Sequence, residues 1–164
     1  MPIVLVRIDD RLVHGQIVQG WLKNINVDKI AVASDFIASD EMQKLLMSLA
    51  VPNTIELEIK TLEGIAEQLI ANAYEKPRTM IIAAKPSEIL FLINKGAKFQ
   101  SVNVGGMHFA KNKKQILPNI FTDDEDIAIL KEISQRGIEL EGRILPMDER
   151  VDVVAHIKKM QTDK

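Results

Sequence analysis

Short apolar runs alternate along this chain with longer segments in which apolar residues recur every three or four positions. Uniform apolar runs are typical of strands that a sheet buries on both faces, and the spaced pattern is typical of helices that cover such a sheet. Residues 55–59 read I-E-L-E-I, and this alternation predicts a half-exposed strand near a sheet edge. The other strands are predicted at residues 3–6, 29–33, 79–84, 100–104 and 138–140, with one or two short strands in 115–121.

The segments between these runs predict helices. One of them begins with a capping box, Thr122-Asp-Asp-Glu125, and is predicted to end at Gly137. Two others show a stripe of apolar residues at helical spacing. These stripes are Val13, Ile17, Trp21 and Ile25, and Met42, Leu45, Leu46 and Leu49; further helices are predicted over residues 61–70 and 86–93 and from Asp148 onward.

The alternation of strands and helices predicts βαβ units. We therefore expect an α/β fold with a mainly parallel open β-sheet and helices on both faces. The chain has 164 residues, which suits one domain with one sizeable core, and it shows no internal repeat or linker. Residues 1–164 are predicted to form this single domain.

Composition argues against several classes of protein. The net charge of −2 and the aromatic content of 4% lack the basic excess of a nucleic-acid-binding protein. No apolar run reaches the roughly 18 residues of a membrane span, and the first residues lack a signal peptide's basic leader, so we expect a cytoplasmic protein. The chain has no cysteine and no glycine-rich nucleotide-binding motif. Its histidines, His14, His108 and His156, lack metal-ligand spacing, and we expect neither a metal nor another cofactor.

Candidate chemistry lies at the strand ends, because open parallel sheets bind their ligands beyond the carboxyl ends of the strands. This rule selects residues 9–15, 34–36, 84–87 and 105–108. The first segment reads D-D-R-L-V-H-G and places two carboxylates, an arginine, a histidine and a glycine within seven residues. Such a composition is typical of a functional loop rather than of a core.

His14 is the candidate nucleophile of this loop. The ordinary pKa of imidazole is about 6.5, so near pH 7 a large fraction of the molecules carry a neutral ring that is able to attack. The planar fork of Arg11 suits two oxygens of a phosphate, and backbone N–H groups around Gly15, at the start of a helix, supply further donors for an anion. These groups suit covalent catalysis in which a histidine holds a phosphoryl group between two transfers. The alternative is a surface histidine that hydrogen-bonds to Asp10 and fixes the loop.

Other polar and glycine residues have weaker signals. Asp9 and Asp10 form a general acid–base pair, or one of them caps the helix or orients a neighbouring side chain. Gly105 and Gly106 begin a flexible loop after the fifth strand, where they either let backbone approach a phosphate or a partner or form a tight turn. The run from Lys111 to Lys114 either docks an acidic partner or is a solvated loop, and we favour the solvated loop.

One segment, R-I-D-D-R-L-V-H-G-Q-I at residues 7–17, resembles a known active-site loop. It is similar to that of the IIB components in the mannose/fructose/sorbose family of the phosphoenolpyruvate-dependent sugar phosphotransferase system (PTS). Residues 102–107, V-N-V-G-G-M, fit the same family, as do Ser34-Asp35 and Asp40-Glu41-Met42. The resemblance covers essentially the whole chain, whose length is that of a stand-alone IIB protein. It leaves position 108 unfixed.

The resemblance implies a phosphoryl carrier, with the activity of a protein-N(pi)-phosphohistidine–sugar phosphotransferase. The histidine of the H-G-Q motif is His14, which then accepts phosphate through Nδ1 from a phosphohistidine of a IIA component. It passes the group to a sugar that crosses the membrane components IIC and IID. Arg11 lies at the active site and neutralises the transferred group. The implied fold agrees with the one predicted above, and the implied location is cytoplasmic, at the membrane permease.

Both partners must reach His14, so we expect a shallow and exposed imidazole. The apolar residues Leu12, Val13 and Phe36 near the loop either form a contact patch for these partners or pack in the core. Two other classes of function remain open: a non-catalytic ligand-binding or signalling module on the same scaffold, and a small acid–base enzyme that uses Asp10 with His14. The sequence does not specify the sugar, because specificity in this family resides mostly in the membrane components.

Overall fold

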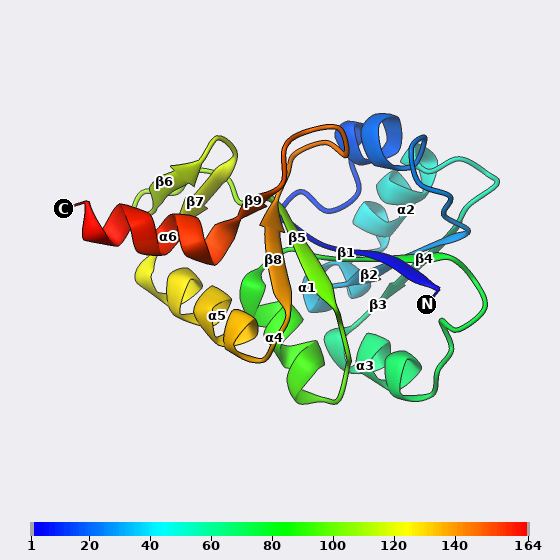
Figure 1. Ribbon diagram of the computed structural model, residues 1–164. Helices are drawn as coiled ribbons and strands as arrows, with labels where there is room; N and C mark the ends of the chain where they lie inside the picture. The colour runs from blue at the N-terminus through cyan, green and yellow to red at the C-terminus, as the bar shows by residue number, and fades with distance from the viewer. Residues whose placement is uncertain (1, 164) are drawn as a thin grey trace.

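Seven strands form one open sheet in the order β3-β2-β4-β1-β5-β8-β9, as the computed structural model of residues 2–163 shows (Figure 1). All neighbouring strands pair in parallel except β9, which runs antiparallel to β8. The half-exposed strand predicted near an edge is β3, at the edge. The strands are β1 Ile3–Asp9, β2 Lys29–Ala33, β3 Glu56–Lys60, β4 Thr79–Ala83, β5 Ser101–Gly106, β8 Glu139–Gly142 and β9 Val151–Asp152.

The central strands bury alternate residues in two different hydrophobic clusters, one on each face of the sheet. In β4, Ile81 and Ala83 belong to one cluster and Met80 and Ile82 to the other. All five residues of β4 are buried and four of them are apolar, as expected for a strand that the sheet buries on both faces. The predicted α/β fold, with a mainly parallel open sheet in a single domain, is confirmed; residues 1 and 164 of the predicted range lie outside the described residues.

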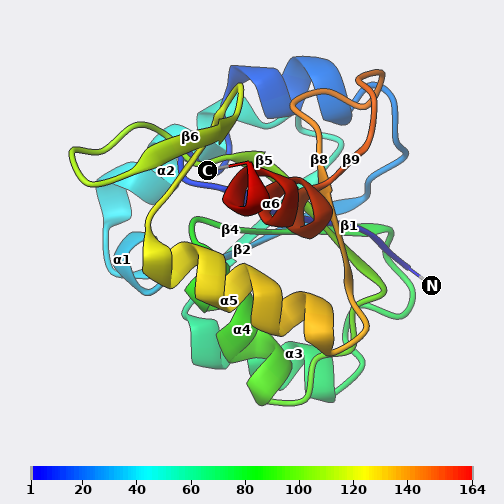
Figure 2. The ribbon, with the colours of Figure 1, turned by 60° about the vertical axis from the view of Figure 1, so that its left-hand side comes forward.

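Helices cover both faces of this sheet (Figure 2). On one face lie α3 Leu62–Ile70, α4 Pro86–Asn94, α5 Asp124–Gln135 and α6 Val153–Thr162. On the other face lie the short π-helix η1 Ile17–Trp21, α1 Asp35–Ala38 and α2 Glu41–Ala50. None of the helices within residues 2–163 is both long and apolar enough to cross a membrane.

Two smaller strands, β6 Lys114–Leu117 and β7 Ile120–Thr122, form an antiparallel hairpin around Pro118, as predicted for residues 115–121. The apolar stripe of α2 is less conventional. Met47 is the buried residue of this helix, whereas the stripe of Met42, Leu45, Leu46 and Leu49 is 52–75% exposed. The helix therefore turns most of its apolar side chains away from the sheet.

Several predicted boundaries were wrong, among them the end of the strand predicted at residues 3–6, which extends to Asp9. The capping box of α5 is formed by Asp123 and Asp126, whose carboxylates accept each other's backbone N–H at 2.8 and 3.1 Å, because Thr122 is still part of β7. The last helix begins at Val153 instead of Asp148, since β9 pairs with β8 and Asp152 caps the helix. The strand predicted to end at residue 104 extends to Gly106.

Candidate active site

The loop that carries His14 leaves the carboxyl end of β1, which lies between β4 and β5 near the middle of the sheet. Leu12 and Val13 anchor the loop, because both side chains are buried in the hydrophobic cluster beneath η1. Of the three apolar residues considered for a contact patch, these two therefore pack in the core. Phe36, at 72% exposure, lies on the surface.

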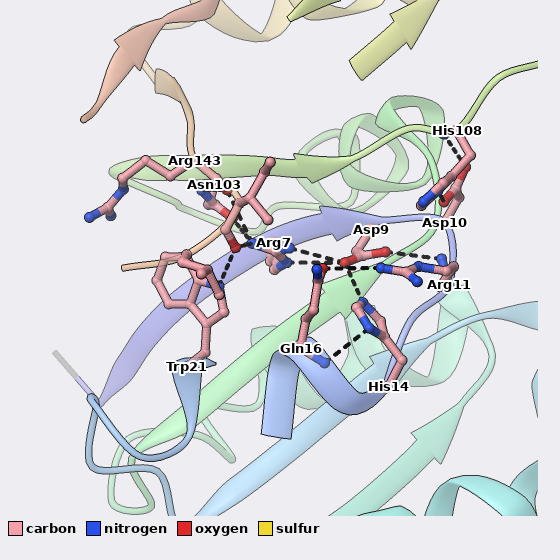
Figure 3. Close-up of polar contacts among 12 residues, drawn as sticks. Arg7, Asp9, Asp10, Arg11, His14, Gln16, Trp21, Asn103, His108 and Arg143 are labelled. Carbon is pink, nitrogen blue, oxygen red and sulfur yellow. Dashed lines mark hydrogen bonds and ion pairs between the residues drawn. The ribbon is translucent and has the colours of Figure 1, made fainter. Parts of the chain in front are cut away.

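The two ring nitrogens of His14 have different partners (Figure 3). Nε2 lies 2.8 Å from Oδ2 of Asp9. A carboxylate only accepts, so Nε2 carries the hydrogen. Nδ1 accepts a longer hydrogen bond, 3.3 Å, from the backbone N–H of Gln16, so its lone pair points into the exposed loop. The arrangement leaves Nδ1 as the nucleophilic atom of the ring.

The imidazole is less exposed than we expected. Only 15% of the His14 side chain is accessible, because its bond to Asp9 draws the ring toward the sheet. Asp9 itself is 1% exposed and is the last residue of β1. His14 therefore presents one edge of its ring to the outside rather than the whole side chain.

Asp9 is the centre of the polar network. Its Oδ1 accepts the backbone N–H of Arg11 at 3.0 Å, and its Oδ2 accepts Nη2 of Arg7 at 3.0 Å as well as the His14 ring. Burial alone raises the pKa of this carboxyl, but the hydrogen bond from His14 and the charge of Arg7 outweigh burial and lower the pKa of Asp9 below its ordinary value. Asp9 thus stays ionised and orients both His14 and the backbone of the loop.

Arg7 supports Asp9 from inside the protein. This fully buried guanidinium donates to Oδ1 of Asn103 at 2.7 Å and to the backbone carbonyl of Ile144 at 3.2 Å. It also stacks 5.3 Å from the ring of Trp21, whose other neighbour is the guanidinium of Arg143 at 5.2 Å. Burial lowers the pKa of Arg7, but the paired carboxylate and the carbonyls satisfy its charge.

Gly105 and Gly106 are buried residues of β5 rather than a flexible loop. A Cβ on Gly105 would lie 2.0 Å from Cζ of Arg7, and a Cβ on Gly106 would lie 3.0 Å from Oδ1 of Asp9. The missing side chains therefore make room for the Arg7–Asp9 pair. Gly15, by contrast, is exposed and has no heavy atom within 4 Å of a built Cβ.

Arg11 and Asp10 point to different sides of the loop (Figure 3). The exposed Arg11 reaches across the loop, and its Nη2 donates to Oε1 of Gln16 at 3.1 Å, beside His14. Asp10 instead contacts His108, whose backbone N–H it accepts at 2.7 Å. Asp9, not Asp10, is the carboxylate that contacts His14.

The lysine run from Lys111 to Lys114 lies in the segment that leads into the β6–β7 hairpin and ends at the first residue of β6. Lys113 donates to Asp126 of the α5 capping box at 2.8 Å, and this bond raises the pKa of Lys113. Lys114 is the first residue of β6, and His156 lies in α6. Within residues 2–163, no group of three histidine or acidic side chains is placed to hold a metal ion.

Sequence reasoning missed Arg7 as a functional residue. The available signal was a charged residue inside an otherwise apolar strand, two positions before Asp9. Residues two apart in a strand lie on the same face, so this spacing places Arg7 beside Asp9. Trp21 and Asn103 lie far away along the chain, and only the folded sheet brings them together with Arg7.

Comparison with known proteins identifies the class to which this fold and site belong. A family model described as "PTS system sorbose subfamily IIB component" matches residues 3–164. The chain belongs to this family of PTS IIB phosphoryl carriers, as its resemblance to the family predicted.

Individual relatives agree with this assignment. The chain is 37% identical over 160 residues to the PTS system fructose-specific EIIB component of Bacillus subtilis, with 98% of each chain covered. It is 35% identical to the PTS system mannose-specific EIIAB component of Escherichia coli, covering 98% of this chain and 50% of that protein. The crystal structure of the IIBSor domain of the sorbose permease from Klebsiella pneumoniae matches with a TM-score of 0.91 at 28% identity, over 97% of this chain and 98% of that one.

Proposed function

We propose that this chain carries a phosphoryl group on Nδ1 of His14, which it accepts from a phosphohistidine of a IIA component and donates to a sugar. The observation that carries this proposal is the fixed orientation of the imidazole. Nε2 lies 2.8 Å from the Asp9 carboxylate, and Nδ1 carries the lone pair, which accepts the 3.3 Å hydrogen bond from the backbone N–H of Gln16. The ring therefore needs no proton transfer before it attacks, and only the hydrogen bond from Gln16 has to break.

In the accepting step, the Nδ1 lone pair attacks phosphorus in line with the leaving nitrogen of the donor. The N–P bond of the donor breaks as the new bond to His14 forms, and the donor imidazole takes the electron pair. The ring of His14 gains positive charge, which the buried carboxylate of Asp9 stabilises through Nε2–H. No proton leaves His14 in this step.

Two groups of the loop suit the transferred phosphoryl oxygens, and Gly15 leaves space beside them. The guanidinium of Arg11 lies beside His14, where its fork suits two of these oxygens. The backbone N–H of Gln16, which bonds to Nδ1 in the unphosphorylated ring, becomes available to an oxygen once Nδ1 is occupied. Gly15 carries no side chain between them, so a partner can approach this backbone closely.

In the donating step a sugar hydroxyl oxygen attacks phosphorus, and the bond from phosphorus to Nδ1 of His14 breaks. Nδ1 recovers its electron pair, and the hydroxyl proton passes to solvent. The proposed partners are a IIA component as donor and the membrane components IIC and IID, which present the sugar, so the chain works in the cytoplasm beside the permease. The mannose-specific relative is an EIIAB component, which supports a IIA donor. Only the edge of His14 is accessible, so each partner must insert its reacting group into the loop.

The structure gives little support to an acid–base enzyme that uses Asp10 with His14. Asp10 is hydrogen-bonded to His108, and the carboxylate that contacts His14 is Asp9, whose pKa is lowered. A general acid or base works best with a pKa near the operating pH, and the lowered pKa of Asp9 moves it away from that range.

Intact-mass measurement tests the carrier function. The protein is incubated with phosphoenolpyruvate, the general phosphotransferase proteins and a cognate IIA whose own phosphorylation is verified by its mass. We expect an acid-labile gain of one phosphate that His14→Ala abolishes and that the control His156→Ala retains. Long-range ¹H–¹⁵N spectra should then place the phosphate on Nδ1. An unphosphorylated wild-type protein beside a fully phosphorylated IIA would falsify the proposal.

A further inference from the structure

A second aspartate–histidine pair lies at the same edge of the sheet (Figure 3). Oδ2 of Asp10 accepts the backbone N–H of His108 at 2.7 Å, and Oδ1 pairs with Nδ1 of the same ring. Asp10 also donates its own backbone N–H to the carbonyl of Gly106 at 3.1 Å. We name these contacts the outer clasp. They tie the loop of His14 to a segment 98 residues further along the chain.

The far side of the outer clasp is firmly anchored. Met107, the residue before His108, is 3% exposed. Its backbone N–H donates to the carbonyl of Asn119 at 2.9 Å, and its carbonyl accepts the N–H of Phe121 at 2.8 Å. His108 is therefore attached to both β5 and the β6–β7 hairpin, which makes it a rigid support for Asp10.

The turn that follows Asp10, on the near side of the outer clasp, has a strained backbone. Leu12 has a φ of +57°, in the left-handed region that non-glycine residues rarely adopt. Such a conformation is unfavourable for a residue with a side chain and persists only where surrounding contacts hold it. The buried side chain of Leu12 and the bonds of Asp9 hold the inner side of the turn. The outer clasp holds the side that faces solvent.

We propose that His108 is a positioning residue for phosphoryl transfer and acts through Asp10; this inference rests on the proposed role of His14. With the ring bond in place, the strained turn keeps Arg11 and Nδ1 of His14 in the geometry for in-line attack. Without it, Asp10 keeps only its backbone contacts, and the turn relaxes away from that geometry.

The test measures single-turnover phosphoryl transfer from phosphorylated IIA at rising IIA concentration. We expect His108→Ala to lower the rate constant at saturating IIA about fivefold, the effect of one charge-assisted hydrogen bond, while the half-saturating concentration is unchanged. His108→Asn should restore most of the rate, because its amide N–H replaces the imidazole N–H toward Asp10. His156→Ala, which changes the histidine in α6, should transfer at the wild-type rate.

Two further measurements separate positioning from other roles. Amide ¹H–¹⁵N resonances of residues 10–16 should shift in His108→Ala without any phosphate present, which reports the loop directly. The Asp10→Ala and His108→Ala double variant should be no slower than Asp10→Ala alone. Wild-type transfer rates in His108→Ala, or multiplying effects in the double variant, overturn the positioning role alone. No phosphate uptake by the wild-type protein overturns the carrier function and the positioning role together.

Discussion

Replacing Gly105 by alanine tests whether the buried arginine network depends on the missing side chain. The added Cβ would lie 2.0 Å from Cζ of Arg7 and 2.2 and 2.4 Å from its Nη atoms, whereas ordinary contacts begin near 3.4 Å. The guanidinium cannot move freely, because Asp9 and Asn103 hold it on one side and Trp21 stacks against it. The substitution must therefore either expel Arg7 from its site or displace β5 from β1.

Either response is costly. Expelling Arg7 leaves the carboxylate of Asp9 buried without its guanidinium, and breaking such a pair costs about 3–5 kcal/mol. Overpacking that is relieved by backbone shifts costs about 1–3 kcal/mol. We therefore expect Gly105→Ala to lower the free energy of unfolding by roughly 3 kcal/mol, a large part of the usual 5–15 kcal/mol of a domain.

Urea unfolding followed by fluorescence measures this loss. Trp21 is the only tryptophan, is 2% exposed and stacks between Arg7 and Arg143, so its emission reports the network itself. Gly15→Ala is the matched control, because its Cβ meets no atom within 4 Å and it should change stability by less than about 1 kcal/mol. Equal stability of Gly105→Ala and the wild-type protein would refute the steric argument.

Three other substitutions give distinct results. Arg11→Ala should keep the melting temperature within about 2 °C, since exposed side chains contribute little to packing. It should slow phosphoryl transfer from IIA, with Arg11→Lys at an intermediate rate, and an unchanged rate would contradict the role of Arg11. Asp9→Asn should slow transfer by a factor on the order of 100 or more, because an amide no longer fixes the tautomer of the His14 ring. Single-turnover mass analysis measures this rate, and a near-normal rate would contradict the role of Asp9. Burial raises the pKa of Glu88 in the folded protein. As pH rises above the ordinary pKa of a glutamate, the folded protein therefore loses stability, because the carboxyl ionises more readily in the unfolded chain. Glu88→Gln keeps an acceptor for the N–H of Ala84 and should gain stability relative to wild type between pH 4 and pH 7 in urea titrations, whereas an equal difference at both pH values would argue against buried charge.

The sequence predicts the sheet well because its central strands are buried on both faces. A strand such as β4, with no exposed residue, leaves a run of apolar letters that no amphipathic helix shows. The helix boundaries were less predictable. Asp123 and Asp126 form the same type of capping box that was predicted one residue earlier, and the pattern alone does not reveal that β7 extends through Thr122.

The candidate site was predictable in its position and less so in its contacts. The composition of the loop is enough to indicate His14 and Arg11, since both lie in one short segment and the order of the strands is not needed to recognise them. The pairing of Asp10 with His108 depends on β5 lying beside β1, which no local pattern specifies. The low exposure of the His14 ring depends on its bond to Asp9. From the sequence, Asp9 and Asp10 were an acid–base pair or, as we favoured, one of them was a cap or an orienting group.

Asp9 and Asp10 show how two adjacent carboxylates acquire different tasks from burial. Asp9, at 1% exposure, lies where water does not screen its charge, so it fixes the tautomer of His14 and, in the proposed transfer, stabilises the charge on the ring. Asp10 is 34% exposed, and its bond to His108 is screened by solvent and salt. Rising salt should therefore weaken the outer clasp and leave the Asp9–His14 bond intact. For the same reason, a change at Asp9 alters the chemistry of the ring, whereas a change at Asp10 alters where the loop holds that ring.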